Sequence, residues 1–293
     1  MKRESGRAAN VLGPRPAKGP SVKVEIGART DVGRVRTNNE DNFKVVPELN
    51  LFVLSDGMGG EAHGEVASKM AVEGISAHIN EAEKNPKTPS FGETRPDLTP
   101  ATNRLISAIH LANQMILQTA EKDPTHKGMG ATVVALRLNG ERVSLAHVVD
   151  SRIYLMRNTE MQQLTEDHSL VAEQVRRGVL TLQQAEESKM QSVLLRALGV
   201  EPDVQVDADE QLLLDGDTLL LCSDGLTRMV TDTEIAATLL QYPKSQEAVD
   251  KLIQMACENG GADNVTVVAV RVSLKSDGMF ARIWEWLNEP MDS

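Results

Sequence analysis

Four of five aspartates lie next to short runs that are typical of buried strands and the fifth, Asp41, follows a polar run; carboxylates in such places can bind divalent cations. The five are Asp41, Asp56, Asp150, Asp224 and Asp263. Strand ends in one packed sandwich can meet at a common rim, where clustered carboxylates repel one another and have raised pKa values. A metal ion removes that repulsion, and ligation by oxygen atoms alone favours Mg²⁺ or Mn²⁺ over zinc. Each aspartate taken alone can also be a turn or capping residue.

A Ser–Asp–Gly triplet occurs twice, each time after an apolar run. The two copies are Ser55–Asp56–Gly57 and Ser223–Asp224–Gly225. Aspartate is common in turns, so one copy would carry little information. Its repetition after two predicted strands favours a shared chemical role.

A cysteine phosphatase is a competing interpretation, because Cys222 and Arg228 have the C-x₅-R spacing of its phosphate loop. In that class a thiolate attacks phosphorus while the arginine and backbone N–H groups bind oxygen. Here Asp224 lies inside the loop and would repel a phosphate. Cys222 also ends a leucine-rich run, where a buried and inert thiol is expected. The sequence therefore disfavours this chemistry.

The composition bounds the class of protein. The chain has 293 residues, is 41% hydrophobic and carries a formal net charge of −11. Nucleic-acid binders usually present a basic face, so we expect no nucleic-acid partner. Two cysteines make neither a disulfide framework nor a zinc site, which predicts a cytoplasmic protein. No apolar run reaches about 18 residues, so no membrane span is expected.

The apolar spacing predicts the elements that must position the aspartates. Strands are predicted over residues 22–26, 51–54, 132–138, 143–149, 152–156, 161–164, 204–206, 217–222 and 265–272, and helices over 65–79, 105–116, 235–240 and 248–257. Asn139–Gly140 marks a hairpin between the third and fourth strands. Strand runs separated by pairs of helices predict an α+β sandwich.

The predicted organisation is one domain over residues 22–274. A flexible tail (1–21) precedes it, and an extension (275–293) with Trp284 and Trp286 follows it. The polar segment at about 165–199 is expected to form short helices in a mobile flap. The two tryptophans could serve a partner, as in a regulatory subunit, but capping of the core is the preferred interpretation.

Taken in order, the motifs of the chain resemble the metal-dependent protein phosphatase family, also called type 2C, and its bacterial branch in particular. The matching stretches are residues 30–42 (TDVGRVRTNNEDN), 56–60 (DGMGG), 64–68, 129–132, 146–152, 164–169, 196–199, 222–227 and 261–266. The ordered set is highly specific. It implies two stacked antiparallel sheets flanked by pairs of helices.

The resemblance also implies roles for individual residues. Two metal ions that share a bridging water would be held by Asp41, Asp56, the carbonyl of Gly57, Asp224 and Asp263. Asp150 would help to bind a third, looser ion together with Asp224. Arg36 would hold the substrate phosphate, since a guanidinium suits a tetrahedral oxyanion. Glu40 would orient the metal-bound water, with Asn264 as a supporting donor.

The implied activity is hydrolysis of phosphoserine and phosphothreonine in proteins by a metal-activated water. The expected cofactors are two Mn²⁺ or Mg²⁺ ions, with a possible third. The expected partners are phosphorylated proteins, including a serine/threonine kinase and its substrates. A monomer is the expected form.

Val149 departs from the family pattern, which has glycine before the motif aspartate. A β-branched residue there could shift Asp150 and weaken the third metal, which motivates the alternative of a pseudophosphatase that binds phosphoproteins without turnover. Valine is harmless instead if φ at this position is already β-like. Among the histidines, we expect His63 in a surface loop and His147 in the core, and we assign His168 no role.

Overall fold

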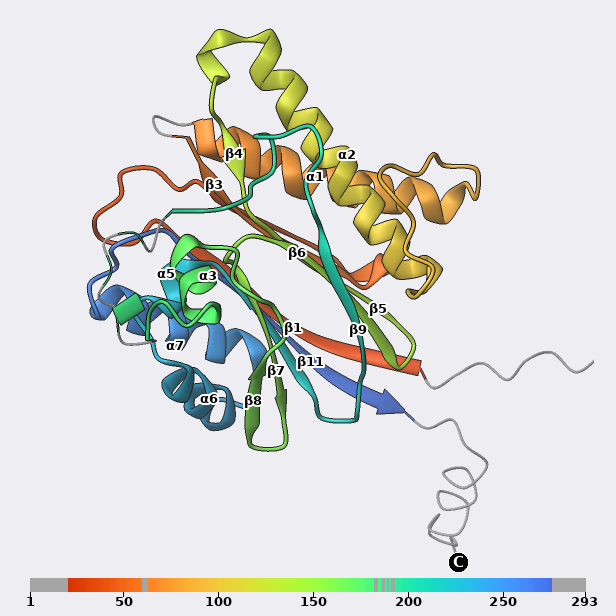
Figure 1. Ribbon diagram of the computed structural model, residues 1–293. Helices are drawn as coiled ribbons and strands as arrows, with labels where there is room; N and C mark the ends of the chain where they lie inside the picture. The colour runs from red at the N-terminus through yellow and green to blue at the C-terminus, as the bar shows by residue number, and fades with distance from the viewer. Residues whose placement is uncertain are drawn as a thin grey trace, which may run out of the picture.

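Two antiparallel sheets pack face to face in the computed structural model, which describes residues 21–59, 63–181, 184–185, 188, 190 and 193–275 (Figure 1). The first sheet has the order β1-β11-β10-β7-β8 and the second the order β2-β3-β5-β6-β9, with β4 paired to β3. Every strand pairing is antiparallel. The predicted α+β sandwich is thus confirmed.

The strands have the following bounds. The first sheet contains β1 (Ser21–Asp31), β11 (Val265–Lys275), β10 (Thr218–Cys222), β7 (Arg152–Arg157) and β8 (Glu160–Gln163). The second sheet contains β2 (Asp41–Val46), β3 (Leu51–Met58), β5 (Val133–Asn139), β6 (Arg142–Val148) and β9 (Asp207–Leu212), with β4 (Gly130–Ala131) at its rim.

Helices cover the outer faces of both sheets (Figure 1). The second sheet is covered by α1 (His63–Lys84) and α2 (Pro100–Lys122), and the first by α5 (Asp224–Thr227), α6 (Asp232–Gln241) and α7 (Ser245–Glu258). The segment predicted as a flap contains α3 (Leu170–Arg176). Short 3₁₀ turns occur at Pro47–Leu49 and Pro124–His126.

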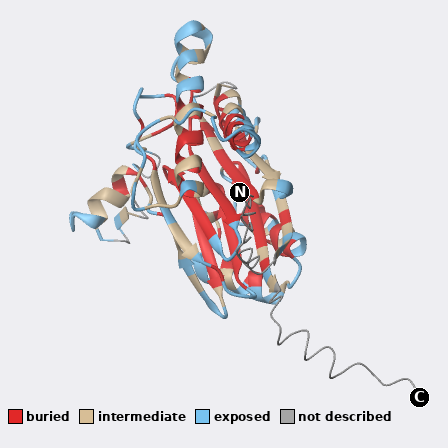
Figure 2. Ribbon diagram, turned by 90° about the vertical axis from the view of Figure 1, so that its right-hand side faces the viewer, coloured by how far each residue is buried: buried red, intermediate tan, exposed pale blue. Residues whose placement is uncertain are grey.

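The central strands are buried on both faces, which explains their continuous apolar sequences. In β3, Leu51 and Val53 pack toward α1 and α2, whereas Phe52 and Leu54 pack between the two sheets. The alternation follows from the two-residue period of a strand. Figure 2 shows the resulting buried layer running through the middle of the molecule.

Two sequence predictions differ from the structure. Residues 204–206 form no strand; β9 lies just beyond them and consists mostly of polar residues. It is an edge strand that pairs only with β6, so its outer side needs no apolar pattern. The strand predicted to end before Asp56 continues to Met58. Residues 1–20 of the tail and residues 276–293 of the extension, which include the two tryptophans, lie outside the described residues. No helix in the described part of the chain is long and apolar enough to cross a membrane.

Two glycines allow the backbone segments around the aspartates to approach closely. A Cβ at Gly57 would overlap the carbonyl oxygen of Gly64 at the start of α1. A Cβ at Gly225 would overlap the carbonyl oxygen of Asn264, just before β11. The glycine of each Ser–Asp–Gly triplet therefore lets a second segment pack directly against the one that carries the aspartate.

We expect Gly225→Ala to lower the free energy of unfolding by about 2 kcal/mol, because the new methyl group would push α5 away from the β11 entry. The matched control is Gly74→Ala in α1, where the added Cβ meets only Met115 and Ala112 side-chain atoms at 3.3 Å or more. That change should be neutral or stabilising by up to about 1 kcal/mol. Urea unfolding measures both, and equal stability of the two variants would contradict this packing argument.

Candidate metal centre

Strands from both sheets bring the predicted aspartates to one junction. Asp41 begins β2 and pairs directly with Asp56 of β3. Asp224 begins α5 directly after β10, Asp263 precedes β11, and Asp150 follows β6. The five carboxylates influence one another electrostatically, so segments that are far apart in sequence form one cluster.

Asp41 is anchored across the sandwich but only half satisfied. Its Oδ2 accepts hydrogen bonds from Ser223 Oγ at 2.8 Å and from Thr266 Oγ1 at 2.7 Å. Ser223 directly follows β10 and Thr266 lies in β11, so both donors belong to the first sheet. Its buried Oδ1 accepts none from any residue that the structure describes. Burial raises the pKa of Asp41 to about 7, against the lowering effect of these two donors and with added repulsion from Asp224 and Asp263. A buried oxygen without a donor is suited to a cation.

The neighbouring carboxyls have the same electrostatic problem. Burial raises the pKa of Asp56 well above its ordinary value, and Asp41, Asp224 and Asp150 raise it further. Burial also raises the pKa of Asp150 to about 7, with repulsion from Asp224. The pKa of Asp224 is likewise raised by burial, and its Oδ1 lacks a partner among the described residues.

Two arginines reach the cluster. Arg36, half exposed, donates from Nη2 to Asp263 Oδ2 at 3.0 Å. Arg228 lies 2.5 Å from Asp224 Oδ2 and 3.7 Å from Asp263 Oδ2. The sequence pointed to Arg228 only as part of a cysteine-phosphatase loop. Arg228 follows Asp224 by four residues, a spacing that brings two side chains together on a helical turn and could have predicted this contact.

Glu40 and Asn264 organise the backbone between the aspartates. The Glu40 N–H donates to Asn264 Oδ1 at 2.8 Å, and the Glu40 carbonyl accepts from the Gly57 N–H at 3.1 Å. The Asn264 amide donates to the carbonyls of Val32 and Asn38 at 3.0 and 2.9 Å. Asn264 thereby connects the Asp263 segment to the loop that leads into Asp41.

The residues present fit divalent cations. The atoms that could ligate a metal are all oxygens. Two of these oxygens are buried without hydrogen-bond partners among the described residues. The carboxylates repel one another, and a bound cation would neutralise that repulsion. Among the described residues, no three of these carboxylates have ligand atoms that all lie within 4.8 Å of one another.

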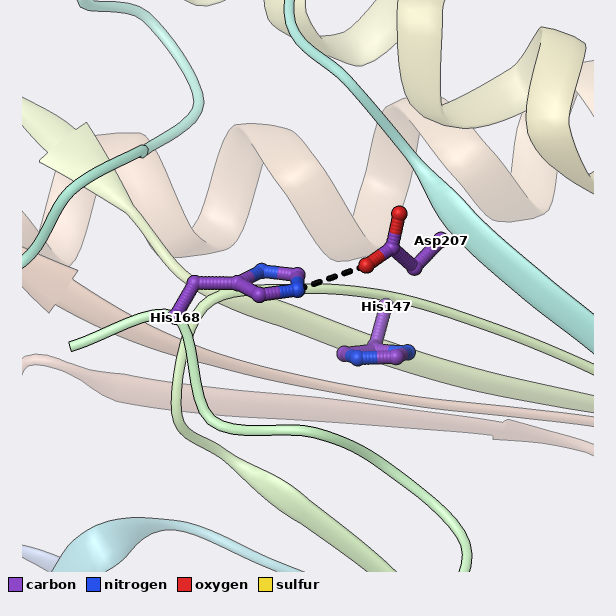
Figure 3. Close-up of side chains that lie close together, drawn as sticks. All are labelled: His147, His168 and Asp207. Atoms are coloured by element: carbon purple, nitrogen blue, oxygen red, sulfur yellow. Dashed lines mark hydrogen bonds and ion pairs between the residues drawn. The ribbon is translucent and has the colours of Figure 1, made fainter. Parts of the chain in front are cut away.

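A compact set of possible ligand atoms lies elsewhere (Figure 3). Within the described ranges, His147, His168 and Asp207 are the residues whose ligand atoms all fall within 4.8 Å of one another. His147 is buried as predicted, and burial lowers its pKa to about 4.

His63 was predicted to lie in a surface loop, but it begins α1, and its ring meets that of His126 edge to face.

Val149 has a backbone conformation that glycine normally adopts. Its φ is +92°, so the expectation that a β-like φ makes valine harmless is wrong. A β-branched residue in this region carries strain of about 1–3 kcal/mol. The residue is fully buried and directly precedes Asp150.

Cys222 is unsuited to nucleophilic attack. It is fully buried in β10, and burial raises the pKa of its thiol to about 12. A thiol that stays protonated cannot act as the nucleophile of a cysteine phosphatase.

The known proteins that this chain is similar to are phosphatases. A family described as protein phosphatase 2C matches residues 33–266. The chain is 40% identical over 255 residues to the serine/threonine phosphatase stp of Listeria welshimeri, across 85% of this chain and 96% of that protein. It is 38% identical over 255 residues to the serine/threonine protein phosphatase PstP of Mycobacterium tuberculosis, across 86% of this chain and 46% of that longer protein.

Solved structures extend the comparison to the fold. The crystal structure of the Mycobacterium tuberculosis phosphatase PstP/Ppp has a TM-score of 0.75 at 34% identity, covering 85% of this chain and 99% of that one. The PstP catalytic domain in complex with two manganese ions has a TM-score of 0.74 at 35% identity, covering 86% and 100%. The sandwich and its rim of carboxylates define the class of metal-dependent protein phosphatases. The chain belongs to the protein phosphatase 2C family.

The raised pKa values predict an unusual pH dependence of the metal-free protein. Folded Asp41 keeps its proton up to about pH 7, whereas the unfolded chain releases it near pH 4, so this contribution to stability is lost as the pH rises between these values. From about pH 5 to about pH 8, the EDTA-treated wild type should lose about 5 °C more in Tm than Asp41→Asn, which cannot titrate at this position.

Adding Mn²⁺ should raise the Tm of the wild type most at the upper end of this range, where the carboxylates are ionised. Differential scanning calorimetry measures both effects. Parallel pH profiles of wild type and Asp41→Asn without metal would contradict the account of Asp41.

Proposed function

We propose that this chain is a metal-dependent phosphatase that hydrolyses phosphoserine and phosphothreonine in proteins. The observation that carries the proposal is the buried carboxylate cluster, in which Asp41 Oδ1 and Asp224 Oδ1 have no hydrogen-bond donor among the described residues. The relatives from Listeria and Mycobacterium, which are serine/threonine phosphatases, and the manganese ions bound by PstP support it.

The metal ligands in this proposal are those predicted from the sequence. Two ions, Mn²⁺ or Mg²⁺, would be held by Asp41, Asp56, the Gly57 carbonyl, Asp224 and Asp263, and a third by Asp150 with Asp224. When bound, the cations supply positive charge for the phosphate and an activated water for attack on phosphorus. Asp41 is suited to a fixed ligand position because Ser223 and Thr266 hold its other oxygen.

Two further side chains complete the proposed site. The half-exposed guanidinium of Arg36 is available to pair with two oxygens of the substrate phosphate. The backbone of Glu40 connects Gly57 and Asn264, and its carboxylate, which contributes to the electrostatic environment of Arg36, would orient the attacking water. In this assignment the protein supplies orientation and the cations supply charge.

The biological setting is proposed on the same basis. Phosphorylated proteins, including a serine/threonine kinase and its targets, are the proposed substrates, and the proposed form is a cytoplasmic monomer. The catalytic domain is proposed to span residues 22–274, with a flap at about 165–199. The pseudophosphatase alternative is not favoured, because all the predicted metal carboxylates and Arg36 are present.

The first test is hydrolysis of a phosphothreonine peptide with Mn²⁺, with and without EDTA. Asp56→Asn should lower kcat/KM by about a hundredfold or more, since it removes a charged ligand from the centre. Cys222→Ala should retain activity, and the control Asp209→Asn, on the exposed side of β9, should match the wild type. EDTA-resistant turnover that is lost in Cys222→Ala would overturn the proposal.

A second test separates substrate binding from metal binding. Arg36→Ala should raise KM for the phosphopeptide about tenfold, because it removes a charge-assisted hydrogen bond to the phosphate. The half-saturating Mn²⁺ concentration should stay near the wild-type value. Arg29→Ala is the control, since that arginine pairs with Asp31 and Asp250. An unchanged KM in Arg36→Ala would refute its phosphate-binding role.

A further inference from the structure

Val149 has a strained backbone conformation, and some contact must hold it there. At φ +92° it has a backbone geometry that valine rarely adopts, and such geometry persists only where the surroundings determine it. Its side chain is fully buried, and the next residue is Asp150. Any relaxation of Val149 would therefore move a predicted metal ligand.

His168 binds both polar backbone groups of Val149. The backbone N–H of Val149 donates to Nδ1 of the His168 ring at 3.1 Å. The backbone N–H of His168 donates to the Val149 carbonyl at 3.2 Å. The imidazole is itself buried. Residues 149 and 168 are thus joined by two hydrogen bonds, which restrict rotation of the Val149 backbone.

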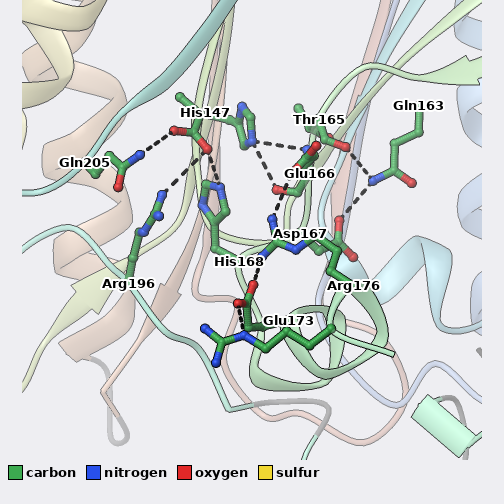
Figure 4. Close-up of polar contacts among 12 residues, drawn as sticks. His147, Gln163, Thr165, Glu166, Asp167, His168, Glu173, Arg176, Arg196 and Gln205 are labelled. Carbon is green, nitrogen blue, oxygen red and sulfur yellow. Dashed lines mark hydrogen bonds and ion pairs between the residues drawn. The ribbon is translucent and has the colours of Figure 1, made fainter. Parts of the chain in front are cut away.

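These contacts determine which nitrogen of His168 carries the proton. A backbone N–H can only donate, so Nδ1 must be the acceptor, and Nε2 carries the proton of the neutral ring. Nε2 lies 2.7 Å from Asp207 Oδ2 and donates to it (Figure 3). Arg196 is 3.6 Å from the same oxygen, and Gln205 donates to the other one (Figure 4). Asp207 thus fixes the tautomer that Val149 requires.

The same hydrogen bonds argue against a metal ion between His147, His168 and Asp207. Metal ligation would need the Nε2 lone pair of His168, but that atom carries a proton while Nδ1 accepts from Val149. The His147 and His168 rings are also stacked, with centroids 5.0 Å apart and planes at 15°. Lone pairs in nearly parallel ring planes do not converge on one ion.

We propose that His168, oriented by Asp207, is a positioning residue that holds Val149 in its left-handed conformation and thereby fixes Asp150 at the metal centre. The link to Asp150 rests on the proposed function. Glycine adopts this φ without strain, so the restraint matters more with valine at position 149 than it would with glycine.

A double-mutant cycle tests the proposal. His168→Phe keeps a ring next to His147 but removes the acceptor for the Val149 N–H. With Val149 present, it should lower kcat/KM and raise the half-saturating Mn²⁺ concentration by about tenfold or more. In the Val149→Gly background, the same change should cost about threefold or less, because glycine needs less restraint.

Two further variants separate positioning from general packing. His168→Asn places an oxygen near the former Nδ1 and should recover most of the Mn²⁺ affinity. His147→Phe alters the stacked ring without touching the Val149 backbone and should stay within about twofold of the wild type. Equal losses for His168→Phe in both backgrounds, or no recovery with Asn, would overturn the proposal.

The thermal stability of the EDTA-treated variants distinguishes failure of this inference from failure of the proposed function. The drop in Tm caused by His168→Phe should be smaller with Val149 present than in the Val149→Gly background, because loss of the restraint also lets the strain of Val149 relax, whether or not the protein has phosphatase activity. If no variant is active but the Tm values are non-additive, the phosphatase proposal fails and the restraint on Val149 stands. Additive Tm values would refute the restraint itself.

Discussion

Carboxylates of like charge repel one another, and burial at a common junction greatly increases the free energy of their ionised forms. Asp41, Asp56 and Asp224 have this problem in the present structure, and burial raises the pKa of each. Hydrogen bonds from Ser223 and Thr266 satisfy only one oxygen of Asp41, and Arg228 pairs with only one oxygen of Asp224. Bound cations would neutralise the remaining negative charge. The architecture around the cluster follows from the need to hold these groups together despite their repulsion.

The sandwich holds the cluster rigidly because its two sheets contribute different carboxylates. The second sheet supplies Asp41 and Asp56 as a directly paired couple, and segments next to the first sheet supply Asp224 and Asp263. Glycine at position 225 lets the Asp224 turn pack against the Asn264 backbone. Strands buried on both faces cannot shift without disrupting two packed layers, so the carboxylates cannot separate to relieve their repulsion.

Much of this organisation could be predicted from the sequence, because it depends on local patterns. Short continuous apolar runs predicted the central strands, the Asn139–Gly140 turn predicted a hairpin, and the repeated Ser–Asp–Gly triplet pointed to the elements that carry Asp56 and Asp224. β9 was misplaced because a polar edge strand is selected by pairing with β6 rather than by its own composition. The φ of Val149 was also beyond reach, since His168, 19 residues later in the chain, binds its backbone. The contact of Arg228 with two aspartates likewise depends on tertiary structure.

Anomalous diffraction from crystals grown with Mn²⁺ decides whether the buried aspartate cluster or the compact set of His147, His168 and Asp207 binds the cations. If the aspartates do, we expect peaks bounded by Asp41, Asp56, Asp224 and Asp263, about 2.2 Å from their oxygen atoms, and no peak between the two histidines and Asp207. A peak at the histidines with none among the aspartates would show that the aspartate cluster is not the cation site.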